Sequence, residues 1–131
     1  MNTRKVGEMM MDKLILIVDD ARFARNLTKR ALASGGYTNI IEAATAAEAI
    51  VAFTDNKPDL TLLDITLPDI SDLTLLKRMM QEDPDARIVM ASAIGQDLII
   101  ADALSAGAVD FITKPFDEED FLSIVKNVLE N

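Results

Sequence analysis

Five side chains that can do chemistry stand where short apolar runs end. Asp19 and Asp20 follow the run at 14–18, and Asp64 ends the run at 60–64; Ser92 ends the run at 87–92, and Lys114 ends the run at 110–114. Each run has the length and apolar character of a buried β-strand. The five residues are distant in sequence, so only a fold that gathers strand ends would bring them together.

Three carboxylates and one ammonium group predict a site for a hard cation and a phosphoryl group. Clustered carboxylates repel one another unless one takes a proton or a cation lies among them. Oxygen ligands without nitrogen or sulfur favour Mg²⁺. A divalent ion and a lysine can neutralise phosphoryl oxygens while a carboxylate oxygen attacks phosphorus. The set Asp19, Asp20, Asp64 and Lys114 therefore indicates phosphoryl transfer.

Strands and helices are predicted to alternate strictly along the chain. We expect strands at 14–18, 38–43, 60–64, 87–92 and 110–114, and helices at 21–34, 46–53, 73–81, 97–107 and 117–128. Five βα units predict a doubly wound parallel sheet with helices on both faces. The carboxyl ends of parallel strands share one edge, where ligands bind, so the fold would bring the five side chains together.

Local signals place the ends of several helices. Thr45 and Glu48 have the spacing of a capping box, and Ser71 or Asp72 is expected to cap the helix at 73–81. The pair Gly35-Gly36 is expected to end the first helix.

The first predicted helix has two notable faces. Phe23, Leu27 and Ala31 share one face, and Arg22, Arg25 and Lys29 share another, with Arg30 beside it. On so acidic a chain the basic stripe is either a docking surface for a kinase or phosphotransfer partner or an ordinary solvated face.

Composition excludes several classes of function. The chain of 131 residues has no cysteine and no histidine, which excludes disulfides, cysteine zinc sites, Ser-His-Asp triads and a phosphohistidine. The net charge of −9 disfavours binding to nucleic acid or anionic membranes. With 50% hydrophobic and 27% charged residues, no membrane-length apolar stretch and no secretory signal, we expect a cytoplasmic protein. We also expect a monomer. We expect a flexible arm at 1–12 and one domain at 13–131.

Four motifs resemble the receiver domains of two-component response regulators. They are VDD at 18–20, LLDITLPD at 62–69, Ser92-Ala93, and DFITKPF at 110–116. The resemblance covers residues 13–130 and implies a flavodoxin-like (βα)5 fold with strand order 2-1-3-4-5. It also implies a phosphorylation-activated switch in a phosphorelay.

The resemblance implies a role for each site residue. Asp64 is expected to accept the phosphoryl group; Lys114 would contact that group, and Ser92 would hydrogen-bond it after a small movement. Mg²⁺ would be bound by Asp20, by Asp64, by the backbone carbonyl of Thr66, and by Asp19 mostly through water.

Further positions carry expectations from the same resemblance. Phe111 matches an aromatic residue that swings inward on activation, and the Lys114-Pro115 peptide bond is expected to be cis. Thr66 and Ile94 would border the path of the hydrolytic water and so tune dephosphorylation. The pair Ser71-Asp72 stands where the family usually has Asp-Gly, which removes a glycine that readily adopts positive φ.

The expected partners are a sensor histidine kinase of the CheA type, or a phosphotransfer protein, and a downstream target. The target would bind the face formed by the helix at 97–107, the strand at 110–114 and the last helix. No output domain is expected after the last helix, which favours a standalone regulator similar to the CheY-like chemotaxis proteins. A standalone receiver in a relay outside chemotaxis remains an alternative.

Two other functions compete with the switch. A Mg²⁺-dependent phosphatase of the haloacid-dehalogenase type also forms an aspartyl phosphate, but it needs an aspartate two residues after the nucleophile, where Thr66 stands. A degenerate receiver would be a constitutive interaction module, but the acidic and lysine set is complete. We therefore expect no enzyme activity beyond the protein's own phosphorylation and dephosphorylation.

Overall fold

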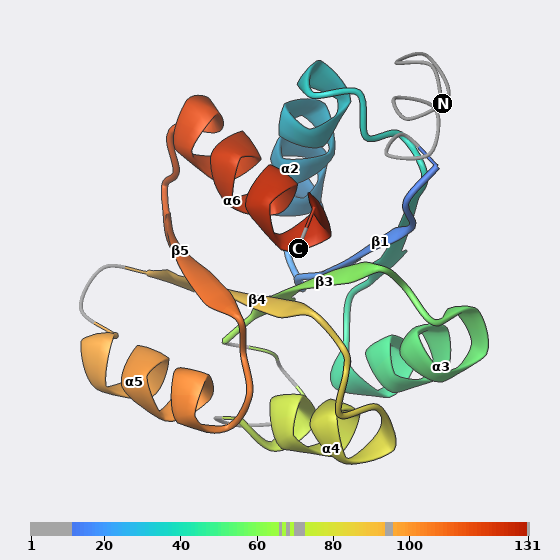
Figure 1. The fold of residues 1–131 in the computed structure, drawn as a ribbon, viewed down its shortest axis with the longest axis vertical. Coiled ribbons are helices and arrows are strands. Elements are labelled where there is room, and N and C mark those ends of the chain that lie inside the picture. The colour runs from blue at the N-terminus through green and yellow to red at the C-terminus, as the bar shows by residue number, and fades with distance from the viewer. Residues whose placement is uncertain (1–11, 66, 68, 70–72, 94–95, 131) are drawn as a thin grey trace.

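The computed structural model describes residues 12–65, 67, 69, 73–93 and 96–130, which form one parallel sheet with helices on both faces (Figure 1). The strands are β1 (Ile15–Val18), β2 (Ile40–Ala43), β3 (Leu60–Asp64), β4 (Ile88–Ala93) and β5 (Asp110–Lys114). The helices are α2 (Arg22–Ser34), α3 (Ala46–Asn56), α4 (Thr74–Glu82), α5 (Asp97–Ser105) and α6 (Glu118–Glu130). The strand order β2-β1-β3-β4-β5 confirms the predicted flavodoxin-like arrangement.

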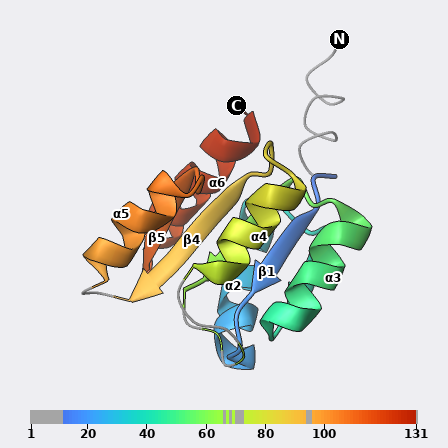
Figure 2. The same ribbon diagram turned by 90° about the horizontal axis from the view of Figure 1, so that it is seen from below.

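Two hydrophobic layers enclose the sheet. In Figure 1, α2 and α6 lie on one face and α3, α4 and α5 on the other, and Figure 2 shows these last three helices side by side. Along β1, Ile15 and Ile17 pack in the cluster of α2 and α6, whereas Leu16 and Val18 pack in the opposite cluster. Successive side chains of a strand point to opposite faces. Because both faces are covered, the run needs an apolar residue at every position.

The capping predictions have different outcomes at α3 and α4. At α3 the Glu48 amide donates to Thr45 Oγ1 at 3.1 Å, and Glu48 Oε1 accepts from the Ala44 amide at 3.2 Å. At α4 the N-cap is Leu73, which makes no side-chain capping bond. The prediction that Ser71 or Asp72 caps α4 is therefore wrong, because the helix begins later and both residues precede the N-cap. Both also lie outside the described residues.

The buried face of α2 differs from the face that Phe23, Leu27 and Ala31 share. Phe23 is 76% exposed and Leu27 is 45% exposed, while Thr28, Ala31 and Leu32 are buried. The Thr28 hydroxyl donates to the Ala24 carbonyl at 3.0 Å, which satisfies this group away from water. Contact with both the sheet and α6 therefore decides which side of the helix is covered.

Glycine is required at the ends of two helices. Gly36 has φ +90° directly after α2, as expected of the Gly35-Gly36 pair, and Gly107 has φ +116° after α5. Residues with a Cβ rarely adopt this region. At Gly107 a Cβ would also lie 3.0 Å from Met80 Cε of α4. This glycine therefore allows the chain to turn while α4 packs closely against it.

The N-terminal arm expected at 1–12 lies outside the described residues except for Asp12. The Asp12 carbonyl accepts a hydrogen bond from Asn39 Nδ2 at 3.0 Å, so the chain is held beside β2 from this point. None of the helices in the described segments has the length and apolar character needed to cross a membrane.

The two-layer packing predicts a large difference between two leucines on neighbouring helices. Leu76 of α4 is fully buried, and Leu98 of α5 is 84% exposed. We expect Leu76→Ala to lower the free energy of unfolding by about 2–5 kcal/mol, because it removes transfer energy and leaves a cavity. Leu98→Ala should change it by less than about 0.5 kcal/mol. Urea denaturation of both variants tests this, and equal losses would contradict the packing.

Candidate functional site

Three carboxylates meet at the carboxyl edge of the sheet. Asp19 and Asp20 follow β1, and Asp64 is the last residue of β3, which pairs directly with β1 through Val18 and Leu63. One oxygen from each carboxylate lies within 4.8 Å of the others. Asp19 is buried, Asp64 is half-buried and Asp20 is exposed. The donor set consists of oxygen atoms only, so its chemistry fits a hard divalent cation.

Lys114 brings a positive charge to this cluster from the end of β5. Its Nζ forms a close ion pair with Asp19 Oδ2 and lies 3.7 Å from Asp64 Oδ2. The Lys114-Pro115 peptide bond that follows is cis. β4 separates β5 from β3, so the lysine side chain reaches across the end of β4 to the carboxylates. There Ser92 is buried and pairs with Thr113, next to the Ala93–Lys114 pair.

Every polar group of Asp19 makes a hydrogen bond or an ion pair. Its amide donates to the Ala43 carbonyl of β2 at 3.1 Å, and its carbonyl accepts from Arg25 Nη1 at 2.7 Å. Its Oδ1 accepts from the Ala21 amide at 3.0 Å, and its Oδ2 binds Lys114. This carboxylate is therefore already shared between the start of α2 and the lysine.

The basic stripe on α2 is partly engaged within the protein. Arg25 Nε lies 3.1 Å from Glu42 Oε1, and Lys29 Nζ lies 3.0 Å from Glu42 Oε2. Burial raises the pKa of Glu42, but the hydrogen bonds from Lys29 and Arg25 outweigh that effect and hold the pKa below its ordinary value. Arg22 and Arg30 are exposed, so only part of the stripe faces solvent as a free basic surface.

A second acidic contact joins the chain after β3 to α3. The two carboxylate oxygens of Asp69 accept hydrogen bonds from the Ala46 and Ala47 amides, at 2.8 and 3.1 Å. These bonds, with that from Ala46 the stronger cause, hold the pKa of Asp69 below its ordinary value of 3.8. Unpaired amides at a helix N-terminus favour a negative charge. Asp69 therefore ties the segment that follows Asp64 to a neighbouring helix.

The remaining predicted positions differ in what the structure says of them. Phe111 is 38% exposed, so its ring lies at the surface rather than in the core. Thr66, including its backbone carbonyl, and Ile94 lie outside the described residues, as does the pair Ser71-Asp72.

Sequence reasoning did not identify Glu42 or Asp69 as part of the site's surroundings, and it assigned Arg25 only to a surface stripe. Their contacts join residues 17 to 23 positions apart, between elements whose mutual placement no local pattern specifies. Two local signals were available: Glu42 is an acidic residue within a predicted strand, and Asp69 ends the motif LLDITLPD at 62–69.

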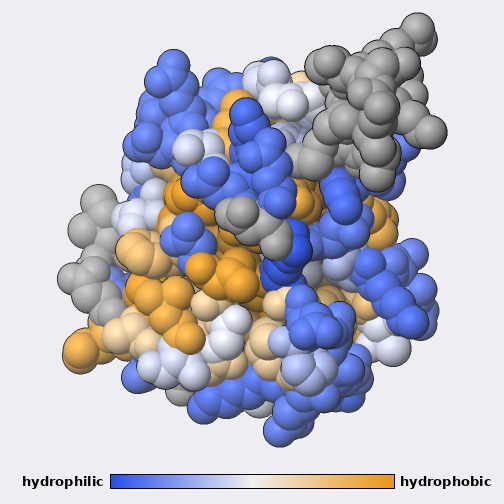
Figure 3. Space-filling view, in the orientation of Figure 1, coloured by the Kyte–Doolittle hydropathy of each residue, from blue (hydrophilic) through white to orange (hydrophobic). Residues whose placement is uncertain are grey.

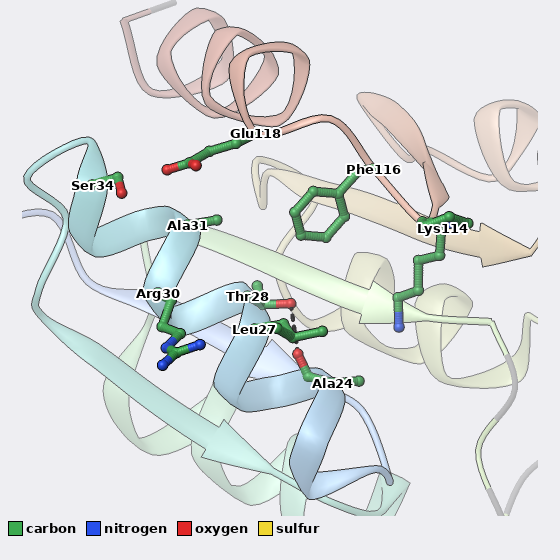
Figure 4. Close-up of a pocket in the computed structure, with 10 residues that line it drawn as sticks. Ala24, Leu27, Thr28, Arg30, Ala31, Ser34, Lys114, Phe116 and Glu118 are labelled. Atoms are coloured by element: carbon green, nitrogen blue, oxygen red, sulfur yellow. Dashed lines mark hydrogen bonds between the residues drawn. The ribbon is translucent and has the colours of Figure 1, made fainter.

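A groove runs beside the site between α2 and the segment joining β5 to α6. Figure 4 shows Phe116 facing α2 across this groove, with Lys114 at one end. Its volume is about 600 Å³, and Leu27 and Ala31 contribute to its apolar wall. Phe116 stacks on Phe121, with ring centroids 4.5 Å apart. Leu27, which is 45% exposed, and Lys114 both line this groove.

A family model and individual relatives identify the same kind of domain. A family model described as the response regulator receiver domain matches residues 15–126, which include every predicted site residue. The chemotaxis protein CheY of Bacillus subtilis is 43% identical, over 88% of this chain and 96% of its own length. Sporulation initiation phosphotransferase F of Bacillus subtilis is 34% identical, over 92% of this chain and 96% of its own length.

Solved structures agree with these sequence comparisons. The crystal structure of the receiver domain of NtrX from Brucella abortus matches with a TM-score of 0.84 and 33% identity. The match covers 89% of this chain and 98% of the NtrX domain. The likeness therefore extends over nearly the whole fold.

The Asp69 contact predicts a pH-dependent contribution to stability. Because the pKa of Asp69 is lower in the folded chain than in the unfolded one, its contribution is complete well above pH 3.8 and is lost as the pH falls through the lowered pKa. We therefore expect Asp69→Asn to be less stable than the wild type at pH 7, with a difference that shrinks below pH 3.8.

Urea denaturation at pH 7, 5 and 3 measures this difference. Asp85→Asn is the matched control, because Asp85 is exposed and its carboxylate bonds to no described residue. A difference for Asp69→Asn that stays constant over this range would contradict the role of its charge.

Proposed function

Because this chain belongs to the response regulator receiver family, the phosphorylation-activated regulators of two-component systems, we propose that Asp64 is its phosphoacceptor in a Mg²⁺-dependent reaction. The observation that carries the proposal is the meeting of Asp19, Asp20 and Asp64 within 4.8 Å, with Lys114 beside them. The family assignment also favours a receiver over the haloacid-dehalogenase alternative.

The chemical step is a transfer between two nucleophiles. A carboxylate oxygen of Asp64 attacks the phosphorus of a phosphohistidine on a kinase or phosphotransfer protein. An O–P bond forms as the N–P bond breaks, and the imidazole nitrogen leaves with the electron pair. Lys114, already 3.7 Å from Asp64 Oδ2, neutralises the phosphoryl oxygens, and Ser92 donates a hydrogen bond to them.

The distribution of partners supports different roles for the two adjacent aspartates in binding Mg²⁺. The Asp20 carboxylate is exposed and bonds to no described residue, so it is available as a direct ligand. Asp64 and, by resemblance to the family, the Thr66 carbonyl would be the other protein ligands. The Asp19 carboxylate is shared between the Ala21 amide and Lys114, which favours a water-mediated role. The bound ion supplies positive charge next to the phosphoryl oxygens.

The proposed target surface is the face formed by α5, β5 and α6. Apolar side chains stand exposed on it, with Leu98 at 84%, Val109 at 48% and Phe111 at 38%. Figure 3 shows apolar surface where Figure 1 draws α5. Burial of Phe111 on phosphorylation would change this surface directly.

We place the proposed phosphorelay in the cytoplasm, because the kinases that would donate the phosphoryl group take it from ATP there. Similarity to the chemotaxis protein CheY supports a role in chemotaxis or flagellar motor control, with a histidine kinase of the CheA type as donor. Similarity to sporulation initiation phosphotransferase F supports a relay of another kind. In either setting the chain catalyses only its own phosphorylation and dephosphorylation.

Labelling with a small phosphodonor tests the assignment of Asp64. Incubation with acetyl phosphate and Mg²⁺, followed by borohydride reduction and peptide mapping, should label Asp64 alone. Asp64→Asn should lose the label, because the amide oxygen is a poor nucleophile. Asp59→Asn is the control, since Asp59 precedes the same strand at the opposite edge of the sheet and should leave labelling unchanged. Full labelling of Asp64→Asn would refute the assignment.

The side chains at positions 66 and 94 predict a long-lived phosphorylated state. Hydrolysis needs a water aligned opposite the leaving carboxylate, and neither Thr66 nor Ile94 offers an amide or carboxylate to hold it. We expect the double variant Thr66→Asn with Ile94→Glu to lose phosphate roughly tenfold faster than the wild type. Decay is followed after removal of the donor. If both proteins decay at the same rate, water access is not what limits hydrolysis.

A further inference from the structure

The peptide bond between the two adjacent aspartates is held from one side by Arg25. Arg25 Nη1 donates to the Asp19 carbonyl at 2.7 Å, and that carbonyl belongs to the peptide joining Asp19 to Asp20. On the preceding peptide, the Asp19 amide is bound to the Ala43 carbonyl of β2. The backbone leading into Asp20 is therefore fixed by contacts with two other elements.

The side chain of Asp20 has no comparable support. It is exposed, and no described residue donates to its carboxylate. The backbone therefore sets where the Cα–Cβ bond of Asp20 points, and so which positions its carboxylate can reach beside Asp19 and Asp64. A ligand whose backbone is already fixed at a metal site loses less conformational freedom when the ion binds.

Arg25 is itself held in place by Glu42 of β2. The Nε–Oε1 distance is 3.1 Å, and the Arg25 side chain is only 15% exposed. The planar guanidinium can serve the carbonyl and the carboxylate at once, whereas an ammonium group is a single point charge. Lys29, one turn later, binds the same Glu42 but makes no bond to Asp19.

We propose that Arg25, held by Glu42, is a positioning residue for the Mg²⁺ site: it fixes the Asp19–Asp20 peptide so that the Asp20 carboxylate is presented to the ion. This inference rests on the proposed role of Asp20 and Asp64 in binding Mg²⁺. It gives Arg25 a task within the domain, distinct from the docking surface that the basic stripe suggested.

Simple electrostatics and loss of positioning predict opposite changes in Mg²⁺ affinity for the variant Arg25→Gln. Removing a positive charge near three carboxylates should strengthen their attraction for a cation. Loss of positioning should weaken binding, and removal of a residue that supports a metal ligand typically lowers affinity by about tenfold or more. Arg25→Gln therefore separates the two explanations by the direction of the change.

The experiment is a titration of metal-stripped protein with MgCl₂, followed by the NMR shifts of backbone amides, since the chain contains no tryptophan. We expect both Arg25→Gln and Arg25→Lys to bind Mg²⁺ about tenfold more weakly than the wild type. Lys29→Gln is the matched control: it removes a positive charge from the same helix face and a bond to the same Glu42, and it should bind at least as tightly as the wild type.

The rate of labelling by acetyl phosphate gives a second readout. In the Arg25 variants this rate should be reduced at low Mg²⁺ and restored by saturating Mg²⁺, because only binding of the ion is affected. Unchanged or tighter binding in both Arg25 variants would overturn the inference, as would a reduced rate that excess Mg²⁺ does not restore. Absence of saturable Mg²⁺ binding in the wild type would instead overturn the proposed function.

Discussion

Repulsion among three carboxylates at one edge of the sheet is the constraint on which the rest of the structure depends. β1 and β3 are adjacent, so Asp19, Asp20 and Asp64 must meet once the sheet forms. Lys114 offsets part of that repulsion by pairing with Asp19 and lying near Asp64. Lys114 lies at the end of β5, and β4 lies between β5 and β3. The charge balance of the site therefore depends on the order of these strands in the sheet. Folding and function are thus linked through a single group of charges.

Asp19 is anchored through its backbone and through both oxygens of its side chain. Contacts from β2, from the start of α2, from Arg25 and from Lys114 use its amide, its carbonyl and both carboxylate oxygens. Asp20, one residue later, is open to solvent. This contrast gives two neighbouring residues of the same type different chemistry: one holds the lysine and the backbone, and the other is available to a cation. If Asp64 is phosphorylated as proposed, the phosphoryl group would compete with Asp19 for the same ammonium, and the site would then have two alternative charge arrangements.

The strands that carry the outer site residues also lead to the proposed target surface. Ser92 pairs with Thr113, and Met90 pairs with Phe111 two residues earlier on β5. A movement of Ser92 or Lys114 would thus occur on the strands that hold the exposed ring of Phe111. A ligand shifts a protein between two states only by interacting differently with each. The ammonium of Lys114 and the hydroxyl of Ser92 are the groups whose contacts would differ between the two states.

Sequence alone determined the alternation of elements, the strand order through resemblance, and the five strand-end residues of the site. Strand and helix periodicities are local properties, and the carboxyl ends of parallel strands share one edge in any such sheet. Tertiary structure alone decided which carboxylate pairs with Lys114 and which face of α2 is covered. It also decided that Glu42 binds Arg25 and that Asp69 binds the start of α3. Those outcomes depend on distances between elements far apart in the chain, which no local pattern encodes. The prediction of the N-cap of α4 failed for a related reason: the N-cap is Leu73, whose side chain is buried, and burial depends on the tertiary structure.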